Sequence, residues 1–120
     1  MRLKSAAILG VAIGGTLFAG PVAAAPDQTQ GVALMSAIVN ADGSLKSGTG
    51  VVSSERIDAG IYEVRFNRDI RDCVPVATVF EIGFAQLSEP AAGTLVNVGT
   101  HTANGGLSDF PFSLLVFCPK

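Results

Sequence analysis

Alternating apolar and polar positions predict a half-buried β-strand at residues 61–67. Its apolar side chains share one face and its polar side chains the other: Tyr62, Val64 and Phe66 against Glu63, Arg65 and Asn67. This period of two is typical of a sheet that covers a core on one side and meets water on the other. Residues 32–40 form an earlier strand-like run. Alternate residues of that run share one face: Val32, Leu34, Ser36 and Ile38.

A β-hairpin is predicted where the 61–67 strand begins. Residues 51–57 form a second strand-like run, and the turn sequence Asp58-Ala59-Gly60 joins the two. Gly60 is expected in the left-handed region of the backbone, as a tight hairpin requires. A two-residue loop at Ala59-Gly60 predicts an apolar pair and an opposite-charge pair across the hairpin: Ile57 with Tyr62, and Arg56 with Glu63.

Three later runs complete the predicted strands. Residues 74–82 carry apolar side chains on both faces, and Pro75 places the start of this strand at a sheet edge or a bulge. Residues 94–99 form a short strand. The run at 112–118 is almost entirely apolar, which is typical of a central strand buried on both faces.

Turn sequences separate these runs, and no sustained helical period occurs after the N-terminal region. Asn40-Ala41-Asp42-Gly43 and Asn104-Gly105-Gly106 are turns, 44–50 is interpreted as a Gly/Ser connection, and 83–93 has no clear pattern. The fold class is therefore all-β. We expect a small antiparallel β-sandwich, or alternatively a small β-barrel, of about six to seven strands.

The first 24 residues have the pattern of a secretory signal peptide. Basic residues come first, an uncharged apolar stretch follows at 6–19, and small residues stand at 22–25. The apolar stretch is shorter than the roughly twenty residues that a spanning helix needs, so no stable membrane anchor is expected. Cleavage after Ala24 predicts a signal-peptide helix at 1–24 and a single secreted β domain at 25–120, located outside the cell or in the periplasm.

Cys73 and Cys118 are the two cysteines of the chain, and both lie in the expected secreted part. Disulfides persist in oxidising compartments, so we expect the two residues to be bridged. Closing a loop of this length contributes on the order of 4 kcal/mol in the chain-entropy model. Two buried free thiols are the alternative. The spacing does not fit a redox pair, and two cysteines with one histidine fall short of a zinc site.

Composition and charge narrow the function classes. The 120 residues carry eight Lys or Arg, ten Asp or Glu and one His, and the net charge is −2. Loss of a signal peptide would make the mature chain more acidic, which argues against a nucleic-acid partner. The chain has no Trp and one Tyr, so it lacks the aromatic platforms of many sugar-binding and single-strand-binding sites.

No catalytic, metal or cofactor motif stands out, so no enzyme activity and no cofactor are expected. His101 is the sole candidate base, and a triad with Ser108, Asp109 or Asp69 has no supporting motif. A solvated loop histidine is the simpler interpretation. The alternative function is a small secreted enzyme or enzyme inhibitor. It would use His101 with Asp109, or an exposed loop at 83–92.

The most concentrated polar feature lies at 65–72 and consists of Arg65, Arg68, Asp69, Arg71 and Asp72. The planar arginine fork binds carboxylates in two places, which makes this segment a candidate interaction surface for a protein or glycan at the cell surface. The alternative is a charged edge that keeps the sheet from pairing with other chains. The arginines also favour ionised, paired carboxylates over an acid–base pair made of Asp69 and Asp72.

Turn and core residues form a pattern along most of the expected secreted part, at 39–45, 48–51, 60–69, 73, 77–78 and 111–118. This pattern resembles a recurring small β module of exported bacterial proteins, similar to modules at the ends of phage tail-fibre and collagen-like chains. The resemblance implies a structural or interaction role. We therefore expect an exported, non-catalytic interaction or structural module of the cell envelope or extracellular space.

Overall fold

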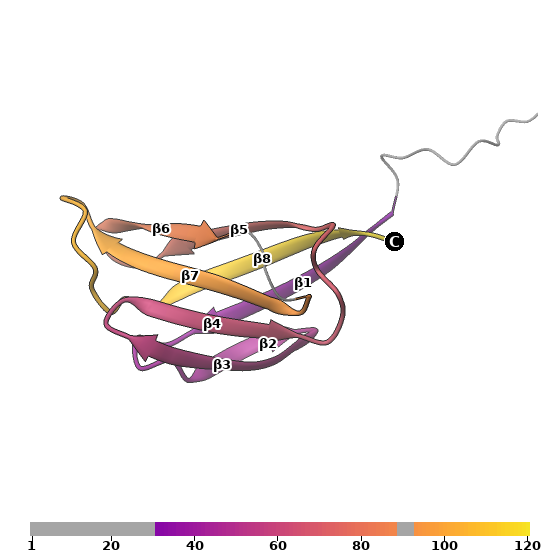
Figure 1. Ribbon diagram of the computed structural model, residues 1–120, viewed down its shortest axis with the longest axis horizontal. Helices are drawn as coiled ribbons and strands as arrows, with labels where there is room; N and C mark the ends of the chain where they lie inside the picture. Colours follow the sequence, from indigo (N-terminus) through magenta and orange to yellow (C-terminus); the bar gives the residue numbers. More distant parts are fainter. Residues whose placement is uncertain (1–30, 89–92) are drawn as a thin grey trace, which may run out of the picture. The chain divides into compact units, whose positions relative to one another are not determined.

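Eight β-strands form two four-stranded sheets in the computed structural model, which describes residues 31–88 and 93–120 (Figure 1). The predicted signal peptide lies outside the described residues. The strands are β1 (Val32–Val39), β2 (Leu45–Thr49), β3 (Val51–Asp58), β4 (Ile61–Phe66), β5 (Val74–Val79), β6 (Gly83–Ser88), β7 (Leu95–Thr102) and β8 (Phe112–Pro119).

One sheet has the strand order β2-β1-β8-β5 and the other β3-β4-β7-β6, and every neighbouring pair is antiparallel. The two sheets do not close into a barrel, so the predicted small antiparallel β-sandwich is confirmed. Residues far apart in the sequence pair in both sheets, as where β1 lies beside β8.

The inward faces of the two sheets form one hydrophobic core. Every second residue of β4 is buried, which confirms the alternation predicted at 61–67. Tyr62 of β4 and Phe112 of β8 meet across the core, with ring centroids 5.0 Å apart in an edge-on arrangement. The buried apolar side chains are Met35, Ala37, Val39, Tyr62, Val64, Phe66, Ile70, Val96, Val98, Phe112, Leu114, Val116 and Cys118.

The eight strands exceed the about six to seven predicted, because two strands lack a clear alternating signal. β2 lies where a Gly/Ser connection was expected, and all five of its residues are exposed. Its backbone hydrogen bonds to β1 hold it at the edge of the sheet. β6 occupies the start of 83–93, so the expected exposed loop at 83–92 begins as an edge strand. Residues 89–92 lie outside the described residues.

β8 is the central strand that 112–118 predicts, but it is buried on one face only. It pairs with β1 on one side and with β5 on the other. Leu114 and Val116 point into the core, whereas Leu115 and Phe117 are 38% and 36% exposed on the outside. The prediction of two-sided burial is wrong because a second layer packs against only one face of this sheet.

β5 is an edge strand, as Pro75 predicts. It ends at Val79, earlier than the expected 82, and Phe80 and Ile82 are exposed in the connection to β6. The outward side chains of β5 are exposed as well, so the expected cover on both faces is absent from the part of the chain that the structure describes.

The β3–β4 hairpin is confirmed, but its register differs from the prediction by one residue. Arg56 lies opposite Tyr62, and Glu55 lies opposite Glu63. An irregularity between Arg56 and Asp58 takes up Ile57 as an extra residue on β3. A β-bulge of this kind bends the strand and changes which side chains face each other. The predicted charge pair of Arg56 with Glu63 is therefore not formed.

The predicted bridge between Cys73 and Cys118 is present, with an S–S distance of 2.06 Å. Cys73 directly precedes β5 and Cys118 lies near the end of β8. The bridge stands beside the cross-strand pair of Val74 and Phe117, so it links two neighbouring strands of one sheet. It closes a loop of 45 residues in sequence separation, which includes β5, β6, β7 and most of β8.

We expect loss of this bridge to destabilise the domain by about 2–5 kcal/mol, because the unfolded chain regains the freedom of a long loop. Urea unfolding of the oxidised and reduced protein at one pH measures the difference. Alkylation of the reduced thiols keeps the bridge from re-forming. Equal unfolding midpoints for the two forms would show that the bridge does not stabilise the fold.

Candidate functional site

The segment of Arg65, Arg68, Asp69, Arg71 and Asp72 runs from the end of β4 into the β4–β5 connection. The Nη1 of Arg65 donates to the hydroxyl of Thr94 at 2.9 Å. Arg68 reaches backbone carbonyls of Asp69 and Pro119 at 3.3 and 3.4 Å. This segment is therefore held against the start of β7 and the end of β8.

Arg71 and Asp69 form an exposed ion pair within the segment. Nη2 of Arg71 lies 2.6 Å from Oδ2 of Asp69, and Nε of Arg71 also donates to this carboxylate. The guanidinium of Arg71 and its backbone N–H lower the pKa of Asp69 to about 2. Asp69 is thus ionised and paired, as expected, whereas Asp72, which was expected to be paired as well, forms no ion pair among the described residues. Because Nε and Nη2 of Arg71 already donate to Asp69, this guanidinium is less available to bind a carboxylate of a partner.

His101 lies on the outer face of the β3-β4-β7-β6 sheet. Its ring stacks on Phe84 with 4.7 Å between centroids. Its Nδ1 lies 3.1 Å from the carbonyl oxygen of Gly105, which can only accept a hydrogen bond. The ring also lines a shallow hollow with Gln86 and Asn97. Among the described residues, no hydrogen bond joins His101 to Asp109 or Ser108.

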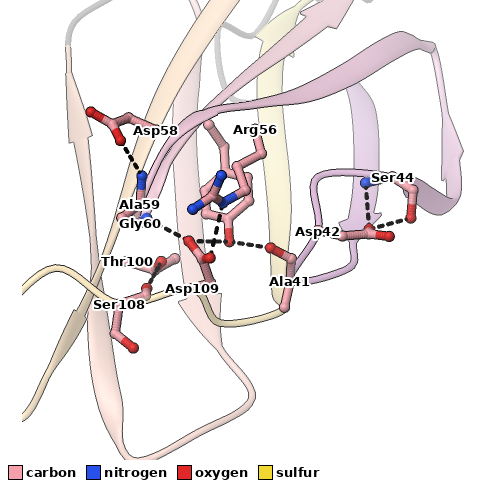
Figure 2. A network of polar contacts seen from close by, with 11 residues as sticks. Ala41, Asp42, Ser44, Arg56, Asp58, Ala59, Gly60, Thr100, Ser108 and Asp109 are labelled. Carbon is pink, nitrogen blue, oxygen red and sulfur yellow. Dashed lines mark hydrogen bonds and ion pairs between the residues drawn. The ribbon is translucent and has the colours of Figure 1, made fainter.

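Asp109 instead takes part in a polar network that links three turns (Figure 2). Its carboxylate accepts hydrogen bonds from Nε of Arg56 at 2.9 Å and from the backbone N–H of Gly60 at 2.6 Å. Nearby, the hydroxyl of Tyr62 donates to the carbonyl of Ala41 at 2.7 Å. These contacts connect the β1–β2 turn, the β3–β4 hairpin and the segment before β8.

The charges in this network stabilise one another. The Arg56 guanidinium, followed by the Gly60 N–H, lowers the pKa of Asp109, and Asp109 raises the pKa of Arg56. Burial, followed by the negative charge of Asp109, raises the pKa of the Tyr62 hydroxyl. Because each charged group already has a partner within the chain, the network is suited to holding the turns in place.

Gly60 is required at the hairpin tip by both conformation and space. Its φ is +69°, as the turn sequence predicts. A Cβ at this position would lie 2.8 Å from the carbonyl oxygen of Thr100 and 2.9 Å from the backbone nitrogen of Ser108. The tip can therefore pack closely against the segment that carries Asp109. Sequence reasoning did not find the Arg56–Asp109 pair, because 53 positions separate the two residues.

A different surface has the character of a binding site: the outer face of the β2-β1-β8-β5 sheet. We call it the apolar face. Its residues come from alternate positions on four strands: Val32, Leu34, Ser36, Ile38, Ser47, Thr49, Val74, Val76, Thr78, Ser113, Leu115 and Phe117. None of these side chains is charged.

The large side chains of the apolar face form continuous rows across the strands. Leu34 of β1 lies opposite Phe117 of β8, which in turn lies opposite Val74 of β5. Leu115 and Val76 form the next pair. The six exposed valine, leucine and phenylalanine residues of this face are between 36% and 61% exposed. Contiguous exposed apolar area of this kind marks interaction sites on soluble proteins.

The outer face of the other sheet shows the usual pattern of a solvated surface. Many of its outward positions carry polar and charged side chains: Glu63 and Arg65 on β4, Gln86 and Ser88 on β6, and Asn97 and His101 on β7. The exposed apolar residues of this sheet, Val52 and Ile57 on β3 and Phe84 on β6, stand among these polar residues. An antiparallel sheet with one wet side normally looks like this. The apolar face departs from that pattern, so the two outer surfaces of the sandwich are suited to different environments.

Within residues 31–88 and 93–120, no group of three or more His, Cys, Asp or Glu side chains is placed to hold a metal ion. The same residues include no helix of the length and hydropathy needed to cross a membrane. Comparison with protein-family models, curated proteins and solved structures finds no match to this chain.

We expect the Asp109→Asn substitution to lower the urea midpoint at neutral pH, because it removes the charge that holds Arg56 and Gly60. The pKa of Asp109 is lowered in the folded state, so its contribution is complete above the unfolded pKa near 4 and is lost as the pH falls through the folded pKa. The difference between wild type and variant should therefore shrink in acid.

Asp72→Asn is the matched control, because the carboxylate of Asp72 has no hydrogen bond or ion pair in the described part of the chain. Urea titrations of the three proteins between pH 3 and 7 make the comparison. Identical midpoints for Asp109→Asn and Asp72→Asn at pH 7 would contradict a structural role for the network.

Proposed function

We propose that this chain is an exported, non-catalytic interaction module of the cell envelope or extracellular space, and that it binds through the apolar face. The observation that carries this proposal is the outer surface of the β2-β1-β8-β5 sheet, where apolar side chains are exposed in rows without a single charge. Leaving such area in water is unfavourable, whereas covering it with a partner releases the water.

The chemistry of the apolar face favours a protein partner over a glycan. Sugar-binding sites combine hydrogen-bonding groups with aromatic platforms. Here the polar atoms are the hydroxyls of Ser and Thr, and Phe117 is the one aromatic side chain among the residues of the face. Aliphatic side chains supply most of the exposed surface, and such surfaces fit the apolar side chains of another protein.

Two further observations support an exported, non-catalytic module. The Cys73–Cys118 bridge is compatible with an oxidising compartment, in agreement with the signal-peptide pattern at 1–24. Separate partners hold His101 and Asp109, the two residues of the enzyme alternative.

We expect Leu115→Lys to abolish capture of a binding partner, because it places a charge in the middle of the apolar face. The oxidised protein serves as bait for envelope and culture fractions, and mass spectrometry identifies what is retained. Gln86→Lys is the matched control, since it adds the same charge to an exposed position of the opposite sheet. Arg71→Ala tests the arginine segment. A partner that Leu115→Lys retains and Arg71→Ala loses would move the site to that segment.

We expect the exported form of the protein to begin at Ala25. Expression of the full 120-residue sequence in a bacterial host, followed by N-terminal sequencing and intact-mass measurement of the protein outside the cytoplasm, tests this. Protein that stays in the cytoplasm with Met1 in place would contradict the proposed export.

A further inference from the structure

We infer that the partner on the apolar face is a second copy of this chain, packed sheet on sheet about a two-fold axis. This inference rests on the proposed function, because it names the partner of the same surface. It follows from the charge, the hydrogen-bonding groups and the edges of the β2-β1-β8-β5 sheet.

The absence of charge makes the apolar face compatible with itself. In a two-fold dimer the same patch meets its own copy, so a charge near the axis faces an identical charge. Like charges brought together in this way cost free energy. No Lys, Arg, Asp or Glu occurs on β1, β5 or β8, and the one charged residue of the four strands is Lys46, the extra residue on the edge strand β2. Self-association therefore meets no electrostatic penalty there.

The polar atoms of the apolar face are also self-complementary. They belong to serine and threonine side chains: Ser36, Ser47, Thr49, Thr78 and Ser113. A hydroxyl both donates and accepts hydrogen bonds, so two copies of one hydroxyl can bond to each other. Carboxylates only accept and ammonium groups only donate, and neither kind stands on this face. The hydroxyls can thus remain hydrogen-bonded when the face is covered by its own copy.

The arrangement of apolar and polar residues favours pairing in a defined orientation. The hydroxyls of Ser36, Ser47 and Ser113 line a shallow hollow where β1, β2 and β8 meet. The exposed Val74, Val76 and Phe117 lie toward β5. With a two-fold axis near the centre of the sheet, Val74, Val76 and Phe117 of one copy can pack against the hollow of the other copy.

The dimensions of the face agree with a small dimer interface. The four strands have eight, five, six and eight residues, and strand spacing and rise give them a footprint of roughly 430 Å² in projection. Side-chain relief brings the accessible area closer to the roughly 800 Å² per partner of a standard interface. Facing sheets pack about 10 Å apart, with side chains that interdigitate. Such a dimer should dissociate on dilution.

The edges of this sheet are unsuited to the other route of self-association, pairing of edge strands. β5 carries Pro75, which has no N–H to donate. β2 has an irregularity in its pairing with β1 that takes up Lys46 as an extra residue. Proline, lysine and bulges are features that protect sheet edges. Within this sheet, the face is therefore better suited than the edges to contact a second copy.

Sedimentation velocity of the oxidised full-length expression product over a range of concentrations tests the inference. Wild type should shift from monomer to dimer as the concentration rises. Leu115→Lys should weaken the dimer by at least about a hundredfold, because each copy contributes the substitution once. Val76→Lys, which lies opposite Leu115, should act in the same direction, whereas Gln86→Lys should match wild type. Thermal unfolding confirms that each variant is folded.

The outcomes separate this inference from the proposed function. A wild type that stays monomeric at every concentration overturns the dimer. If Leu115→Lys nevertheless loses a captured partner, the apolar face binds a different protein, and the proposed function stands. A dimer that Leu115→Lys and Val76→Lys leave unchanged overturns the assignment to this face. A dimer lost in both variants and kept in Gln86→Lys supports the inference.

Discussion

The structure depends on β8 and on the burial of one of its two apolar faces. This strand pairs with β1 and β5 at once, and its inward residues Phe112, Leu114 and Val116 pack against the opposite sheet. Cys118, near its end, is joined covalently to the residue before β5. Without β8, the strands β1 and β5 would lose their common neighbour and the core would lose one wall. Hydrophobic burial along this strand therefore holds the first sheet together.

At the end of the sandwich near the hairpin, a network of charged and hydrogen-bonded groups joins the turns to one another. Asp109 joins Arg56 and the hairpin tip (Figure 2). Tyr62 links the core to the β1–β2 turn through its hydroxyl. Tyr62 takes part in both the hydrophobic core and the polar network, since its ring packs on Phe112 and its hydroxyl donates to the carbonyl of Ala41. The turns are thus coupled to the core through Tyr62.

The outer faces of the two sheets differ in the side chains that they expose. The outer face of the β3-β4-β7-β6 sheet carries charged residues such as Glu63 and Arg65 beside its exposed apolar residues, whereas the residues of the apolar face on the β2-β1-β8-β5 sheet are apolar or carry only hydroxyls. The same uninterrupted apolar sequence that makes β8 a strong central strand also produces this exposed surface. β8 has apolar side chains on both faces, but among the described residues only its inner face is packed against another sheet. The exposed apolar face is the physical basis of the proposed function and of the proposed dimer.

Short-range sequence patterns determined the all-β class, the alternation of β4, the β3–β4 turn with Gly60 and the edge position of β5. These features depend on local properties: the alternation of apolar and polar residues, the missing N–H of proline and the positive φ of a turn glycine. The cysteine pair and the signal pattern also follow from the sequence, although residues 1–24 lie outside the structure.

Only the tertiary structure decided which face of β8 is covered, where the hairpin register shifts and which residue pairs with Asp109. Apolar side chains on both sides of a strand do not reveal which side a second sheet will cover. Local patterns also do not reveal that β3 has Ile57 as an extra residue, or that Arg56 pairs with a carboxylate 53 positions away. The arginine segment was the visible polar cluster in the sequence, but its arginines form hydrogen bonds and an ion pair with other groups of this chain at the surface. The apolar face exists only because alternate residues of four separate strands come together in one sheet.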